Sequence, residues 1–197
     1  MCVHLDFEYQ KATQALNYFA ATSKGRQISK LKALKFVYLA DRYHLRKYGM
    51  PITGDEYYAM ELGPVPSGTK NIADFSNSGE KDYEYASKYI KTVDRKTIHS
   101  IQKPDMDVFS KSDTEALSYV VKHFFAKRDV VEFTHKFPEW KKHERALDLQ
   151  SRARMDLADF LENADKKVEF YPLAETDIKL GREYLKTISD ATSAIRG

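Results

Sequence analysis

Residues 31–48 constrain this 197-residue chain more than any other segment, because their apolar side chains cover most faces of one helix. Apolar or aromatic residues recur along it at three- and four-residue spacings, while Phe36, Leu39 and Ala40 fill the remaining side. A helix that is apolar on most faces belongs in the interior of a fold. We therefore predict a buried central helix over about residues 30–48.

Both ends of this helix carry residues that suit a helix terminus. The Ser29 hydroxyl can accept a hydrogen bond from a free backbone amide at the start. Gly49 tolerates the left-handed conformation that ends many helices, and Pro51 cannot extend the hydrogen-bond ladder. Residues 55–62 (DEYYAMEL) then alternate with the two-residue period of a strand. One face of this strand should pack on the helix, and the other should display polar or aromatic groups.

The remaining segments predict further helices and one hairpin. The β-branched runs on either side of Asp94–Lys96 favour a hairpin, which we expect to form a small three-stranded antiparallel sheet with the Tyr57 run. Asp6 suits the start of a first helix, and Ser112 with Glu115 has the spacing of a capping box. Other expected elements are a short helix from Ser67, a polar loop at 77–82, helices at 129–136, from Pro138 and at 155–161, and a final helix with Ile178, Leu185, Ile188 and Ile195 on one stripe.

These elements define a mainly α fold. It is a compact helical domain around the buried central helix, with a small three-stranded antiparallel sheet or hairpin and a C-terminal helical extension. With 42% hydrophobic residues the chain can bury one substantial core, and its length does not suit two full domains. We predict a domain over residues 1–143, with residues 144–197 packed on it. The final helix either caps this core or lies in a groove of a partner, and core capping is favoured.

Charge and cysteine content narrow the classes of function. The formal net charge of +3 is a small difference between 32 basic and 29 acidic residues. Residues 141–156 mix both signs, so a solvated helix face with local ion pairs is favoured over a nucleic-acid site. The single cysteine, Cys2, allows no internal disulfide and suits a reducing cytoplasm. No apolar run reaches the roughly 20 residues that span a bilayer, and no signal peptide is recognised, so we expect a soluble cytoplasmic protein.

The residues offer no strong catalytic or metal-binding pattern. Asp41 and His44 share one face of the central helix and could do acid–base work, but a carboxylate inside a core is more often hydrogen-bonded for structure. His123, His135 and His143 lie at spacings that match no zinc motif. Phosphate-binding glycine loops and nucleophile elbows are also absent from the sequence. We therefore expect no cofactor, no metal and no enzymatic activity.

Three segments, in order along the chain, resemble one known family. They are KALKFVYLADRYHLRKY at 32–48 with the loop GMPITGDEYYAMELGPVP after it, FSKSDTEALSYVVKHF at 109–124, and VEFTHKFPEW at 131–140. Together they resemble the Panacea domain, the SocA-like antitoxin domain of bacterial and phage toxin–antitoxin systems, over roughly residues 6–143. The resemblance implies an antitoxin that binds a cognate toxin protein and blocks its activity by direct contact.

The density of aromatic residues suggests where such a partner binds. Tyrosine buries a large rigid area while its hydroxyl seeks a hydrogen bond, and the chain has 13 tyrosines. The expected contacts lie in the loop after the central helix, with two helix residues supporting it or touching the partner: Asp55, Tyr57, Tyr58, Glu61, His44 and Tyr48. The resemblance also admits a proteolytic adaptor that delivers a bound toxin to a cytosolic protease. An enzyme centred on Asp41 and His44 remains a further alternative.

Overall fold

Helix α2 (Lys30–Tyr48) forms where the long apolar helix is expected, and every residue from Ala33 to Arg46 is buried. The computed structural model describes residues 5–77 and 79–196. Helices α1 (Tyr9–Thr22) and α5 (Lys111–Phe124) pack against α2, so elements far apart in the chain share one hydrophobic core. Gly49 ends α2 with a φ of +83°, the left-handed conformation that the sequence predicts there.

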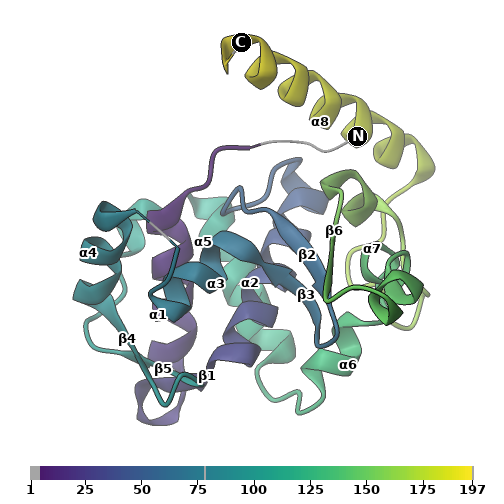
Figure 1. The fold of residues 1–197 in the computed structure, drawn as a ribbon. Coiled ribbons are helices and arrows are strands. Elements are labelled where there is room, and N and C mark those ends of the chain that lie inside the picture. The colour runs from purple at the N-terminus through teal and green to yellow at the C-terminus, as the bar shows by residue number, and fades with distance from the viewer. Residues whose placement is uncertain (1–4, 78, 197) are drawn as a thin grey trace.

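The described residues form eight α-helices, and the mainly α prediction is confirmed (Figure 1). Besides α1, α2 and α5, they are α3 (Ser67–Asp74), α4 (Glu80–Tyr89), α6 (Val130–Thr134), α7 (Pro138–Lys141) and α8 (Glu175–Arg196). Four short 3-10 helices join them: η1 (Lys24–Arg26), η2 (Met106–Val108), η3 (Glu144–Asp148) and η4 (Leu157–Leu161).

Two antiparallel three-stranded sheets accompany the helices. The first has the order β1-β5-β4, formed by β1 (Gln27–Ser29), β5 (Thr97–Ser100) and β4 (Ile90–Val93). The second has the order β3-β2-β6, formed by β3 (Gly63–Pro66), β2 (Tyr57–Met60) and β6 (Arg152–Arg154). Three-stranded antiparallel sheets are thus confirmed.

The expected sheet joining the 90–100 hairpin to the Tyr57 run is wrong. Gly63 has a φ of +93°, and the tight turn there folds β3 directly back onto β2. The other edge of β2 pairs with β6, so no edge remains for the hairpin. The hairpin pairs instead with β1, where Ile98 lies opposite Ile28.

Several expected helix caps differ from the structure. Ser29 is the N-cap residue of α2, as expected, but its hydroxyl makes no capping hydrogen bond, and α1 begins at Tyr9 with Glu8, rather than Asp6, at its N-cap. The capping box of α5 is formed by Ser110 and Asp113, whose side chains each accept a hydrogen bond from the other's backbone amide. This box lies two residues before the one expected. Helix α4 starts at Glu80, so it replaces part of the polar loop expected at 77–82; Ser78 of that loop lies outside the described residues.

Residues 141–161 differ most from the expectation, because they form η3, β6 and η4 instead of two α-helices. The backbone amide of Met155 donates to the carbonyl of Tyr57 at 2.9 Å, which continues the pairing of β6 with β2. The expected helices at 130–134 and from Pro138 are present. The final helix, α8, buries Leu185 and half-buries Ile178 and Ile188 (yellow in Figure 1). Cys2 and the side chain of Ile195 lie outside the described residues.

Two arginines of α2 bind Glu139 in α7 and residues that follow α7. Arg42 is fully buried, and its guanidinium donates to Glu139 at 2.7 Å and to both carboxylate oxygens of Glu169 at 2.8 and 2.9 Å. The Tyr38 hydroxyl also donates to Glu139, at 2.6 Å. Arg46 donates to the carbonyl oxygens of Phe160, Glu162 and Tyr171 at 2.8 to 3.0 Å. Residues 160–171 are thus held against α2 by buried charge-assisted hydrogen bonds.

We predict that Arg42→Met lowers the free energy of unfolding by about 3–5 kcal/mol, because it leaves the Glu139 and Glu169 carboxylates buried without their cation. Urea denaturation of the purified variant measures the loss. The matched control is Arg182→Met, which removes an exposed pair with Glu162 and should cost less than about 1 kcal/mol. Equal losses in the two variants would contradict a structural role for Arg42.

Candidate functional site

The loop after α2 is held from inside by the buried carboxylate of Asp41. Asp41 accepts hydrogen bonds from the backbone amides of Ile52 at 2.8 Å and Thr53 at 3.1 Å, from the Thr53 hydroxyl, and from the Tyr57 hydroxyl at 2.8 Å. Burial raises the pKa of Asp41, and these hydrogen bonds act in the opposite direction. Tyr57 is only 1% exposed, so its hydroxyl belongs to this internal network.

Asp55 caps helix α3 from within the fold. Its carboxylate, 3% exposed, accepts from the backbone amides of Gly68 and Thr69 and from the Thr69 hydroxyl, all at 2.7 Å. Burial raises the pKa of Asp55 to about 6. The preceding Gly54 has a φ of +61°, and a Cβ there would lie 2.2 Å from the carbonyl oxygen of Asp6. Glycine is therefore required for the turn that aims Asp55 at α3.

His44 joins the end of α2 to the start of α5. Its Nδ1 bonds the carbonyl oxygen of Met50, and its Nε2 lies 3.0 Å from the Ser112 hydroxyl and 3.2 Å from Asp113. Asp41 bonds to the loop at 52–57 instead. The two side chains considered as a possible acid–base pair therefore bind different partners, and each makes structural hydrogen bonds.

Three of the six expected contact residues remain accessible at their side chains. Tyr48 is 40% exposed and donates to Glu115 at 2.6 Å. Glu61 is exposed at the β2–β3 turn, and Tyr58 is partly exposed, with the Arg152 guanidinium 5.0 Å above its ring. The other three, Asp55, Tyr57 and His44, are buried and bind neighbouring segments of the chain.

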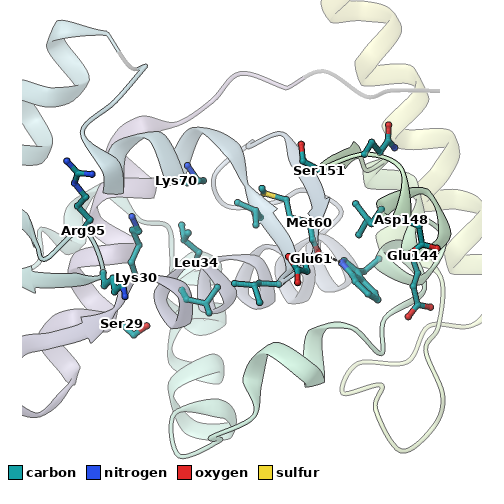
Figure 2. A pocket seen from close by; sticks show the side chains of 17 residues that line it. Ser29, Lys30, Leu34, Met60, Glu61, Lys70, Arg95, Glu144, Asp148 and Ser151 are labelled. Atoms are coloured by element: carbon teal, nitrogen blue, oxygen red, sulfur yellow. Dashed lines mark hydrogen bonds between the residues drawn. The ribbon is translucent and has the colours of Figure 1, made fainter.

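A groove of about 960 Å³ lies between the first turns of α2, the β2–β3 turn and η3 (Figure 2). Its floor and walls are largely apolar, formed by Leu31, Leu34, Met60, Leu62, Val65, Trp140 and Leu147. Leu34 is 14 residues from Tyr48, which corresponds to about 21 Å along a helix. Glu61 and Tyr48, expected on one surface, therefore lie toward opposite ends of α2.

The two ends of this groove carry opposite charges. Figure 2 shows cations at one end and carboxylates at the other. The basic end consists of Lys30, Lys70, Arg95 and Lys96, and the acidic end of Glu61, Glu144 and Asp148. Asp74 pairs with Lys30 and Lys70. Within residues 5–77 and 79–196, Arg95, Lys96 and the three acidic side chains form no salt bridge, so their charges face solvent.

Sequence reasoning missed this groove because four distant segments build it. Trp140 is fixed by its indole N–H, which donates to the carbonyl oxygen of Met60 at 3.0 Å, and by the ring of His135, stacked at a centroid distance of 4.0 Å. Leu62, which is 52% exposed at the β2–β3 turn, carries no sequence pattern that marks it as part of a groove.

The histidines considered as metal ligands lie on separate elements. His123 stacks on Tyr119 in α5, His135 packs on Trp140, and His143 follows α7. Burial lowers the pKa of His135 and of His143. Among the described residues no group of three or more His, Cys, Asp and Glu side chains could hold a metal ion.

Two of the five lysines and arginines at 141–156 pair with carboxylates. Lys142 pairs with Asp159 at 2.8 Å, and Arg154 pairs with Glu56 at 2.7 Å. In the part of the chain that the structure describes, no helix has the length and apolar character needed to cross a membrane.

A family model described as "Antitoxin SocA-like, Panacea domain" matches residues 34–141, more than half of the chain. The chain belongs to this family. Searches of curated proteins and of solved structures gave no match. The Panacea match includes Leu34, the β2–β3 hairpin and Trp140, but the groove continues beyond it, because residues 144–151 supply Glu144, Leu147, Asp148 and one wall.

We predict a pH dependence from Asp55, whose folded pKa of about 6 lies above the ordinary value of 3.8. Between these values the folded protein binds more protons at this group than the unfolded chain, so its contribution to stability falls as pH rises from about 4 to 6 and is then constant. The stability advantage of the wild type over Asp55→Asn should shrink by about 2 kcal/mol from pH 4 to pH 7.

Urea unfolding at pH 4, 5.5 and 7 measures this difference, with Asp148→Asn as an exposed control that should show no such trend. An advantage that grows with pH would mean that the amides of Gly68 and Thr69 outweigh burial.

Proposed function

We propose that this protein is an antitoxin that neutralises a cognate protein toxin by direct binding. Membership of the SocA-like antitoxin family supports an antitoxin role. The observation that carries direct binding is the open apolar groove, at whose ends Arg95, Lys96, Glu61, Glu144 and Asp148 form no salt bridge with the described residues. Exposed apolar surface rimmed by polar groups is typical of protein-binding sites.

The groove can serve as the centre of an ordinary protein interface. Such an interface buries about 1,600 Å² in total and takes about 20–30 residues from each side. Leu62, Met60 and Trp140 belong to residue types that fill the apolar centre of interfaces, and the charged residues at the ends suit a polar rim. A toxin that acts on nucleic acid or a nucleotide has a basic cleft, and Glu61, Glu144 and Asp148 could cover it.

The buried members of the predicted contact set support this surface indirectly. Asp41 and Tyr57 fix the loop that leads into β2, and Asp55 fixes the start of α3 beyond β3. Both flanks of the β2–β3 hairpin are thereby held, and Glu61 and Leu62 are presented in one arrangement. Pre-organisation of this kind reduces the ordering cost of binding.

A proteolytic adaptor is the alternative function. An adaptor needs a second surface, one for the toxin and one for the cytosolic protease. Leu180 and Tyr184 on α8 are exposed apolar or aromatic side chains, and Tyr184 lies beside Gly49 at the far end of α2 from the groove. These residues are the candidates for the protease contact.

Co-expression with the protein encoded beside this gene tests the proposal. We expect that the neighbouring protein alone arrests bacterial growth, that this chain restores growth, and that the two proteins co-purify as a stable complex. Toxin half-life, measured after protein synthesis is blocked, separates the two functions: an antitoxin that acts by binding leaves it unchanged or longer, whereas an adaptor shortens it. Rescue without a complex, or no toxicity, would overturn neutralisation by direct binding.

A further inference from the structure

We infer that the groove binds one apolar segment of the toxin that carries acidic side chains at one end and basic side chains at the other. The acidic side chains of the segment contact Arg95 and Lys96 at the basic end of the groove. Its basic side chains contact Glu144 and Asp148 at the acidic end of the groove (Figure 2). This inference rests on the proposed antitoxin function and specifies the chemistry of the segment that is recognised.

The apolar floor of the groove favours an apolar partner segment. Leu34, Val65 and Trp140 are almost entirely buried beneath it, so the floor is part of the packed core and cannot rearrange freely. Leu62 stands above this floor with half of its surface exposed. A partner side chain placed between Leu62 and the floor would remove apolar surface from water on both molecules.

The charges at the two ends of the groove disfavour a partner whose charges all have the same sign. A nucleic-acid backbone is negative along its whole length, so Glu61, Glu144 and Asp148 would repel it at one end. Arg95 and Lys96 would repel a uniformly basic segment at the other end of the groove. A segment with opposite charges at its two ends is complementary to both ends of the groove, and this complementarity also fixes the direction in which the segment lies.

Side chains rather than strand pairing must provide the recognition. β3 is an edge strand beside the groove, but Pro64 and Pro66 have no backbone N–H to donate. The carbonyl oxygen of Pro64 already accepts a hydrogen bond from the buried Lys35 ammonium at 2.7 Å. β3 therefore offers few of the backbone groups that addition of a partner strand requires.

Residues beyond the family match supply most of the acidic end. Glu144 and Asp148 lie in η3, and residues 150–151 continue the same wall, whereas the match ends at 141. The Panacea match thus contributes much of the apolar floor and, through Lys70, Arg95 and Lys96, most of the basic end, whereas the segment 144–151 contributes two of the three carboxylates of the acidic end. Partner choice should therefore respond to changes in 144–151 without loss of the domain's stability.

Binding of the purified toxin by groove variants tests this inference. Calorimetric titration should show that Leu62→Asp, and separately Glu144→Lys with Asp148→Lys, weakens the complex by at least about 30-fold. The matched controls are Ile101→Asp and Glu175→Lys with Glu183→Lys, which alter exposed residues that do not line the groove. Unfolding curves confirm that all variants fold. Groove variants that bind like the controls would overturn the inference while leaving the antitoxin function intact.

A probe that does not require the toxin keeps the two proposals separate. The probe is a 12-residue fluorescent peptide with two aspartates, a central run of leucine and phenylalanine, and two arginines. It should bind more tightly than peptides with the same centre and four aspartates or four arginines, and Glu144→Lys with Asp148→Lys should abolish the preference. Equal binding of the three peptides would refute the charge assignment. Self-association of the wild type that Leu62→Asp removes would instead identify the groove as a contact between two copies.

Discussion

The buried guanidinium of Arg42 determines how α7 and the segment after η4 pack against α2. It lies on α2, which packs against α1, α5, α6 and η4, and binds one carboxylate from α7 and one from the segment after η4. Arg46 lies 3.4 Å from Glu169, so two cations balance Glu139 and Glu169 within the same interior. Buried charges are tolerated only when geometry and hydrogen bonds satisfy them, and this requirement leaves little freedom in the placement of residues 139–171 against α2.

The geometry of the groove follows from that internal network. Glu139 is adjacent to Trp140, so the pair between Arg42 and Glu139 also positions the indole that forms part of the groove floor. The Trp140 N–H then donates to the carbonyl oxygen of Met60 and couples this part of the floor to β2. On the same helix, Asp41 holds the loop that enters β2 from the other side. Asp41 and Arg42, which are adjacent and buried on α2, thus position two different sides of the groove.

The sequence predicts the helix and its end more accurately than the polar contacts. Periodicity and Gly49 suffice for α2, because both signals are local. Alternation in β2 identifies two faces but not which is internal, and Tyr57 points into the core whereas Tyr58 is partly exposed. The arginines on an apolar helix indicate that buried carboxylates exist, but Glu169 lies 127 residues from Arg42, and no local pattern connects them. The groove depends on four such distant segments.

The division of the groove between the family match and residues 144–151 has a physical consequence for specificity. Apolar burial supplies attraction that is nearly indifferent to the sequence of a partner, whereas charges at fixed positions penalise a wrong sign. The floor, anchored by Leu34 and Trp140, can therefore stay constant while exposed charged residues such as Glu144 and Asp148 vary. Because these two side chains of η3 are exposed and form no salt bridge with the described residues, they can change without disturbing Arg42 or its carboxylates. Under the proposed antitoxin function, such changes would alter which partner segment the groove accepts while its apolar floor stays the same.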